Sequence, residues 1–181
     1  MQTNMRYADI YKFDISNGPG IRVSLFTQGC ARHCKGCFNS ETWDFKGGKE
    51  YNHEVNNYLM SLCDHEWVSG LSILGGEPLN PQNGDTVIRI CQQFKQLFPN
   101  KTIWIWTGND MTDNKWLLRS TYSDGVSHST FKEMLDKYVD VIVDGPFIEE
   151  QKDLSLKWRG SRNQRVWKKN ENNEWYVDIS C

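Results

Sequence analysis

The sequence predicts an α/β protein with a mostly parallel sheet and outer helices, and three observations lead to this expectation. Four short, mostly apolar runs that are typical of strands occur along the chain, at residues 21–26, 71–74, 102–106 and 139–143. Longer segments with helical apolar spacing lie between them, and strands that alternate with helices are typical of parallel βαβ units. The length of 181 residues suits a single domain over residues 1–181.

The first quarter of the chain contains two strands joined by a turn. Residues 6–20 predict a strand and then a turn, because Asn, Pro and two glycines occupy positions 17–20. Residues 21–26 alternate as a strand does and lead directly into a segment with three cysteines. Residues 46–50 are polar and contain glycine, which predicts a loop.

Two amphipathic helices flank the strand at residues 71–74. Their apolar residues predict helices at about residues 52–64 and 85–98, and Asp85 is a plausible N-cap of the second. Cys63 and Cys91 fall on the inner faces of these helices, so both are expected to be core residues.

The rest of the chain continues the alternation of strands and helices and then ends in a predicted hairpin. After a charged loop, two short apolar runs separated by a polar turn predict a small hairpin. In order, we expect a strand at residues 102–106, a short helix within 111–120, a loop at 121–129, a helix at about 130–137, a strand at 139–143 and the hairpin at about 164–178.

The composition excludes several classes of function. Lys and Arg number 21 and Asp and Glu number 23, so the net charge is −2 and no basic surface is expected for nucleic acid or an anionic membrane. No stretch approaches the roughly 20 apolar residues of a membrane span, and residues 1–5 carry no signal-peptide run. We therefore expect a cytoplasmic protein whose six cysteines indicate metal or redox chemistry rather than disulfides.

Three cysteines within eight residues are the strongest chemical signal. Cys30, Cys34 and Cys37 follow the spacing C-x3-C-x2-C, and thiolates suit iron–sulfur clusters and zinc. Three thiolates on one short loop can bind three corners of a four-iron cluster and leave the fourth iron open. The alternatives are a zinc-stabilised binding module without catalysis, with His33 as a nominal fourth ligand, and an accidental group of buried cysteines. Zinc sites usually pair two separated ligand clusters, and this chain has no second one.

A second signal follows the strand at residues 71–74. Gly75 and Gly76 let the backbone approach a ligand closely, and Glu77 adds a carboxylate that suits an ammonium group. Taken alone, this sequence is equally typical of a tight turn.

Together, these motifs resemble those of the radical S-adenosylmethionine enzymes, and within them the glycyl-radical-enzyme activases. The most similar group is the activases of anaerobic (class III) ribonucleotide reductase, and the resemblance covers about residues 6–168. The strings that carry it, besides the three cysteines, are Asn-Gly-Pro-Gly-Ile-Arg at 17–22, Gly-Cys at 29–30, Asn39, Thr-Trp-Asp at 42–44, Pro-Gln-Asn at 81–83 and Trp-Arg-Gly-Ser-Arg-Asn-Gln at 158–164.

The resemblance implies a fold and a cluster. The fold would be a reduced, open partial (β/α) barrel of the radical S-adenosylmethionine type, with about six strands at most. Cys30, Cys34 and Cys37 would hold a [4Fe-4S] cluster whose open iron binds S-adenosylmethionine.

The resemblance also implies contacts to S-adenosylmethionine. Gly75, Gly76 and Glu77 would hold its methionyl amino group. Thr107 and Asp144 are candidates for the carboxylate side, directly or through a monovalent cation, although each could equally cap a strand–loop junction. Many members of the superfamily have an aromatic residue just before the third cysteine, where this chain has Gly36. The adenine contact is therefore expected at the backbone of Gly36, Cys37 and Phe38.

The implied activity is the reductive cleavage of S-adenosylmethionine to methionine and a 5′-deoxyadenosyl radical, with an electron from a low-potential donor. The radical would abstract a hydrogen atom from a glycine of the catalytic subunit of anaerobic ribonucleotide reductase and leave a glycyl radical. Pyruvate formate-lyase or a related enzyme is the alternative partner. Because no side-chain acid or base is needed, no catalytic residue is expected beyond the cluster ligands.

Overall fold

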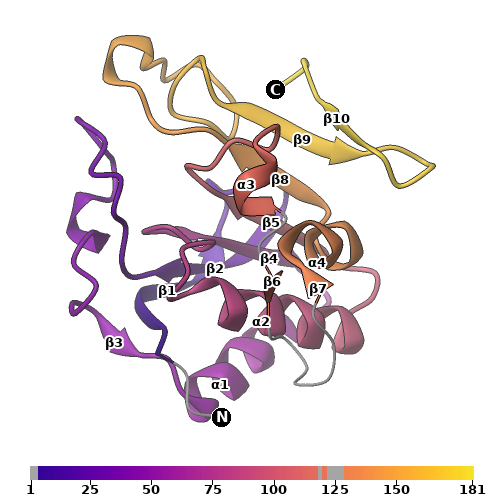
Figure 1. Ribbon diagram of the computed structural model, residues 1–181. Coiled ribbons are helices and arrows are strands. Elements are labelled where there is room, and N and C mark those ends of the chain that lie inside the picture. The colour runs from indigo at the N-terminus through magenta and orange to yellow at the C-terminus, as the bar shows by residue number, and fades with distance from the viewer. Residues whose placement is uncertain (1–3, 118–119, 122–128) are drawn as a thin grey trace.

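The structure, a computed structural model, describes residues 4–117, 120–121 and 129–181 and has a mixed α/β fold. Within these residues, eight strands form one sheet in the order β10-β9-β8-β5-β4-β2-β1-β3 (Figure 1). These strands are β1 (Arg6–Asp14), β2 (Ile21–Thr27), β3 (Lys49–Glu50), β4 (Val68–Gly75), β5 (Thr102–Trp106), β8 (Val141–Asp144), β9 (Arg165–Lys169) and β10 (Trp175–Val177). A separate ribbon pairs β6 (Ser120–Thr121) with β7 (Ser129–Thr130).

The helices begin where the sequence supplies caps. At the start of α1, the Asn52 side chain accepts a hydrogen bond from the Val55 N–H, and α4 begins with a capping box between Thr130 and Glu133. The expected N-cap Asp85 lies instead in the first turn of α2, where its charge suits the helix dipole. The helices are α1 (His53–Cys63), α2 (Gly84–Leu97), α3 (Asn114–Leu117) and α4 (Phe131–Tyr138), with short 3-10 turns η1 (Ser40–Thr42) and η2 (Glu149–Gln151).

Two of the expected elements lie partly outside the described residues. Of the helix expected within residues 111–120, the structure describes α3, and residues 118–119 lie outside the description. Residues 122–128 of the expected loop also lie outside it, while residues 120–121 and 129–130 pair as strands. No helix in the described part of the chain is both long enough and apolar enough to span a membrane.

The expectation of a mostly parallel sheet with about six strands at most was wrong. The three central pairings, β2–β4, β4–β5 and β5–β8, are parallel, and the four outer pairings are antiparallel. A six-residue turn joins β1 to β2, and such a short connection permits only an antiparallel pair. Three strands lie outside the alternation of strands and helices: β3, at residues 49–50, which were expected to be a loop, and the two strands of the expected C-terminal hairpin, β9 and β10.

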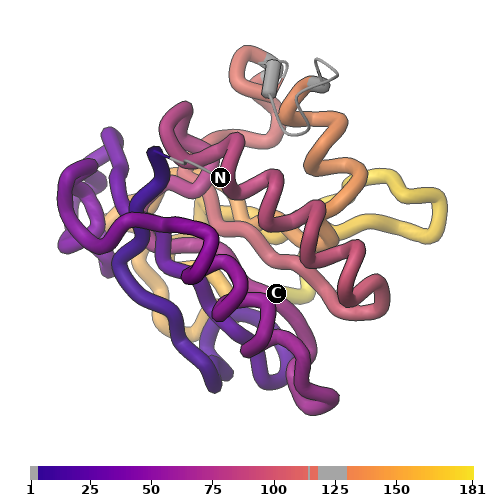
Figure 2. Tube along the Cα trace, turned by 90° about the horizontal axis from the view of Figure 1, so that it is seen from below, coloured from indigo at the N-terminus to yellow at the C-terminus, as the bar shows by residue number. Residues whose placement is uncertain are grey.

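The two faces of the sheet are covered differently. Alternate strand residues such as Val23, Ile73 and Ile105 face α1, α2 and α4 in the larger core, which also buries Cys63 and Cys91 completely. Figure 2 shows α1 and α2 running side by side, and the Asn56 side chain of α1 donates to Gln93 of α2 at 2.8 Å. The opposite face carries a smaller cluster around Trp104, Val141, Val143 and Val166.

This arrangement determines where a site can form. Parallel strands bring their carboxyl ends to one edge of the sheet, and here the ends of β2, β4, β5 and β8 lie next to one another in that order. The segments that follow these four strands include the three clustered cysteines and the Gly-Gly-Glu sequence.

Candidate functional site: a cleft at the carboxyl ends of the parallel strands

The cysteine loop (residues 29–39) leaves the end of β2 and is held by main-chain hydrogen bonds. The Gly29 N–H donates to the Thr42 carbonyl at 2.8 Å, and the Cys30 N–H donates to the Trp43 carbonyl at 3.1 Å. Gly29 has a φ of +97°, which favours glycine. The Thr-Trp sequence of the predicted signature therefore holds the base of the loop.

All three cysteines of this loop are free thiols. Cys30 is buried and Cys34 and Cys37 are partly buried, and burial raises the pKa of the Cys30 thiol. The Asn39 N–H donates to the Cys37 sulfur at 3.4 Å, and hydrogen bonds of this kind tune the potential of an iron–sulfur cluster.

The glycine loop (residues 75–77) leaves the end of β4 beside the cysteine loop. The Glu77 N–H donates to the Gly29 carbonyl at 2.9 Å. A Cβ atom on Gly76 would lie 2.6 Å from the same carbonyl oxygen, and Gly75 has a φ of +101°. Only glycines allow the two loops to approach this closely.

The Glu77 carboxylate is buried and directed into the protein. Its Oε1 accepts from the Thr107 hydroxyl at 2.7 Å and from the Leu79 N–H at 3.1 Å. Its Oε2 accepts from the Gly108 N–H at 2.8 Å and lies 3.5 Å from Arg32 Nε. Thr107, at the end of β5, is thus placed against Glu77, and both residues line the same cleft.

Asp144, the last residue of β8, has a different environment. It is fully buried, and both of its carboxylate oxygens accept hydrogen bonds from the Arg165 guanidinium. The Met111 N–H also donates to it at 2.8 Å. The two carboxylates raise the pKa of Arg165, because Asp144 and Asp110 both bond its guanidinium.

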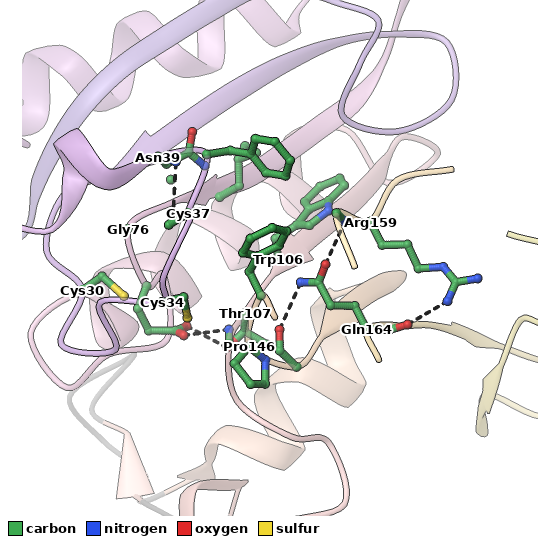
Figure 3. Close-up of a pocket in the computed structure, with 18 of the residues that line it drawn as sticks. Cys30, Cys34, Cys37, Asn39, Gly76, Trp106, Thr107, Pro146, Arg159 and Gln164 are labelled. Carbon is green, nitrogen blue, oxygen red and sulfur yellow. Dashed lines mark hydrogen bonds between the residues drawn. The ribbon is translucent and has the colours of Figure 1, made fainter. Parts of the chain in front are cut away.

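These loops surround one cleft of about 610 Å³, a size common for cofactor and small-molecule sites. Figure 3 shows the cysteines on one side of the cleft and Trp106, Arg159 and Gln164 on the other. Among the predicted site residues, Gly36 and Asp144 do not line the cleft. Those that do are Cys30, Cys34, Cys37, Phe38, Gly75, Gly76, Glu77 and Thr107.

Residues 145–164 form the opposite side of the cleft, which we call the outer wall; the cysteine loop and the glycine loop form the inner wall. The Gln164 side chain stabilises the outer wall by bonding to main-chain atoms of both its ends. Its Oε1 accepts from the N–H groups of Gly160 and Ser161, and its Nε2 donates to the Gly145 carbonyl. The Trp106 indole donates to the Trp158 carbonyl at 2.7 Å and joins the wall to β5.

Sequence reasoning assigned no role to the outer wall. The string at residues 158–164 supported the resemblance, and that string was the available signal. The structure now places Trp158, Arg159, Gly160 and Gln164 along the cleft.

The two walls also contact one another directly. The Phe38 ring packs against Phe147 with 5.1 Å between ring centroids, and a Cβ atom on Gly160 would lie 2.7 Å from the Phe38 ring. An exposed ion pair of 2.9 Å between Lys35 and Glu149 adds a second contact.

The donor set fits a cluster with three protein ligands. Three free thiols line one cleft beside a backbone that only glycine could form. The His33 ring stacks on Trp43 with 4.6 Å between centroids. Within residues 4–117, 120–121 and 129–181, no group of three His, Cys, Asp or Glu side chains is arranged around a single metal ion. A cubane offers each thiolate its own iron corner, so its ligands need not meet at one point.

Comparison with known proteins identifies a family of similar chains. Residues 16–167 match the family described as "4Fe-4S single cluster domain". The chain is 40% identical over 176 residues to the anaerobic ribonucleoside-triphosphate reductase-activating protein of Enterobacteria phage T4, covering 96% of this chain and all of that protein. The proteins of the same name from Vibrio cholerae and Escherichia coli K12 are 38% and 34% identical over 164 residues, with 90% of this chain and 97% of each relative covered.

Proposed function

Because this chain belongs to the family of anaerobic ribonucleoside-triphosphate reductase-activating proteins and contains a 4Fe-4S domain, we propose that it activates the catalytic subunit of anaerobic ribonucleotide reductase by radical S-adenosylmethionine chemistry. Its sheet would then be the open partial barrel of that superfamily, with the parallel strands β2, β4, β5 and β8 as its central part.

One observation carries the proposal: three free thiols and the glycine loop line the same cleft. Cys30, Cys34 and Cys37 would each bind one iron of a [4Fe-4S] cluster. The open iron would face this cleft, whose size is ordinary for a nucleotide-sized ligand. Gly75 and Gly76 would present backbone carbonyls to the methionyl ammonium group.

The remaining predicted residues that line the cleft would contact the same ligand. Cys37 and Phe38 line the cleft and Gly36 does not, so of the three residues expected at adenine the backbone of Cys37 and Phe38 would contact it, and Thr107 would lie near the methionyl carboxylate. Asp144 would act indirectly, since its carboxylate is bonded to Arg165 at the start of β9.

When bound, the cluster would pass one electron to S-adenosylmethionine, whose C5′–S bond would break to give methionine and a 5′-deoxyadenosyl radical, and this radical would take a hydrogen atom from a glycine of the reductase subunit. The chain itself orients the two groups side by side, which favours a step within one complex. Trp106, Trp158, Phe38 and Phe147 give the cleft apolar walls that exclude water. A low-potential donor would provide the electron.

Electron paramagnetic resonance tests this function directly. Protein with a reconstituted cluster is reduced under anaerobic conditions and incubated with S-adenosylmethionine and the reductase catalytic subunit. We expect the doublet of a glycyl radical on the reductase and no doublet with the Cys34→Ala variant. A doublet on pyruvate formate-lyase in place of the reductase would contradict the choice of partner. One zinc and no iron in anaerobically purified protein would contradict radical chemistry altogether and favour a zinc-stabilised binding module.

A further inference from the structure

The Glu77 side chain is the centre of a hydrogen-bond network that joins the loops around the cleft. We propose that Glu77 and Arg32 are positioning residues, and that the Glu77 carboxylate holds these loops together rather than binding the methionyl ammonium group itself. The inference rests on the proposed function, because it concerns how S-adenosylmethionine is held.

The Glu77 carboxylate is buried and surrounded by partners, which disfavours direct binding of an ammonium group. A carboxylate offers about four lone-pair sites. Three hydrogen-bond donors and one cation already surround it: the Thr107 hydroxyl and the Leu79 N–H donate to Oε1, the Gly108 N–H donates to Oε2, and Arg32 forms an ion pair of 3.5 Å with Oε2. Only 5% of the residue is exposed. An ammonium group at Oε2 would have to displace the arginine cation or lie beside its like charge.

Arg32 extends the network from the cysteine loop to the loop after β5. Its guanidinium pairs with Glu77 and donates to the Asn109 side chain. A Cβ atom on Gly108 would lie 2.4 Å from Arg32 Cδ, so a glycine at this position lets the arginine lie against the backbone. Arg32 therefore has a fitted position between the two loops.

Asn109 continues the network to the outer wall. Its side-chain amide donates to the Thr107 hydroxyl at 3.0 Å, and its main-chain carbonyl accepts from the Gly145 N–H at 2.9 Å. The segments after β2, β4, β5 and β8 are thus connected through one set of bonds centred on Glu77. Loss of Arg32 or Glu77 would change the spacing between the cysteines and the glycine-loop carbonyls, which we expect to meet the ammonium group.

The first test uses Arg32, because the two possible roles of Glu77 predict effects of opposite sign. S-adenosylmethionine binding to cluster-reconstituted protein is measured by anaerobic isothermal titration calorimetry. We expect Arg32→Gln to weaken binding about tenfold, the typical consequence of losing one charged hydrogen-bonded partner. If Glu77 bound the ammonium directly, removing Arg32 would free an oxygen, and unchanged or tighter binding would overturn the proposal.

Two variants make this test specific. Arg32→Lys keeps a cation beside Glu77 and should restore most of the affinity. Arg6→Gln is the matched control, since Arg6 forms an ion pair of 3.6 Å with Glu50 and does not line the cleft. It should bind S-adenosylmethionine as the wild-type protein does, and an equal loss of affinity in this variant would refute a specific role for Arg32.

Glu77→Gln completes a double-mutant cycle. Whichever way the glutamine amide is turned, its NH2 group faces the N–H of Leu79 or of Gly108, which cannot accept a hydrogen bond. The single variant should therefore lose affinity, and adding Arg32→Gln should cause little further loss because both changes disrupt one network. Losses that multiply in the double variant would indicate independent roles and overturn the proposal.

A readout without S-adenosylmethionine separates this inference from the proposed function. In the absence of the ligand, thermal unfolding of the reconstituted variants should show the same non-additivity between Arg32→Gln and Glu77→Gln. If the wild-type protein does not bind S-adenosylmethionine, the proposed function fails and the thermal cycle still decides whether the network exists. Additive changes in Tm would refute the network even if the wild-type protein binds the ligand.

Discussion

The two walls of the cleft differ in how they are built and in what they can contribute. The inner wall follows the parallel strands β2 and β4, carries three free thiols, and is held mainly by main-chain hydrogen bonds. The outer wall connects β8 to the antiparallel strand β9 and contains neither cysteine nor histidine. Its polar side chains, such as Gln164 and Asn163, bond to backbone atoms of the wall itself.

This difference indicates that the two walls have different roles: the inner wall supplies metal ligands, and the outer wall supplies the shape of the cleft. A metal cluster needs soft ligands at fixed spacing, and the inner wall provides them on a loop whose backbone is fixed at both ends. The outer wall provides aromatic surface from Phe147 and Trp158. We infer that the inner wall holds the cofactor and that the outer wall determines what can enter the cleft.

The largest expected effect is loss of the cluster, and it should occur in a variant of the inner wall but not in a variant of the outer wall. Cys34→Ala on the inner wall should lose the cluster, because two thiolates remain on the loop. Gln164→Ala on the outer wall should keep it, because no ligand is changed. The measurement is iron and sulfide content, with the visible absorption spectrum, after anaerobic reconstitution. Equal loss of iron in both variants would show that the walls are not separable in this way.

The inner wall could be predicted from the sequence because its signals are local. The cysteine spacing and the glycines at positions 75 and 76 are contiguous, and each follows a strand with a clear apolar pattern. Parallel strands bring such segments to one edge, so their proximity could be expected. The partners of Glu77 could not be predicted, because Arg32 and Gly108 are 45 and 31 residues away in sequence and no periodic pattern connects them.

The outer wall and the edge strand β3 could not be predicted for a related reason, whereas the hairpin expected at about residues 164–178 is confirmed by the pairing of β9 with β10. Residues 49–50 are polar and contain no strand pattern, and they form a strand only because the start of β1 offers an unpaired edge. The pairing of β9 with β8 depends on contacts across the whole wall, including the bond from Arg165 to Asp144. Such long-range pairings are not visible in the local periodicity of apolar residues.

The next effect concerns stability at the base of the outer wall. Asp144→Ala removes a fully buried carboxylate and leaves Arg165 with the exposed Asp110 as its partner. We therefore expect the free energy of unfolding to fall by about 2–3 kcal/mol. Asp110→Ala removes the exposed partner of the same guanidinium and should lower the free energy of unfolding by less than about 1 kcal/mol. Urea unfolding of both variants measures the difference. A larger loss for Asp110→Ala would mean that the buried pair does not anchor this wall.

The smallest effect lies at the turn that precedes β2, where Ser16 and Asn17 line the cleft. Burial alone would raise the pKa of Asp14, but hydrogen bonds from the Ser24 hydroxyl and from Ser16 and Asn17 outweigh it and hold the pKa below its ordinary value of 3.8. The folded protein therefore binds this proton less tightly than the unfolded chain. The stability that Asp14 contributes is fully present above pH 3.8 and is lost as the pH falls through its lower folded pKa.

Replacing this carboxylate tests whether the turn is held by its charge. Asp14→Asn should lower the free energy of unfolding at pH 6 and should flatten its decline below pH 4, since the titrating group is gone. Asp9→Asn, an exposed position on the same strand, is the matched control and should follow the wild-type curve. Urea unfolding at each pH provides the comparison. If Asp14→Asn declines as steeply as the wild type, other carboxylates account for the acid sensitivity, and the turn is held by hydrogen bonds that do not depend on charge.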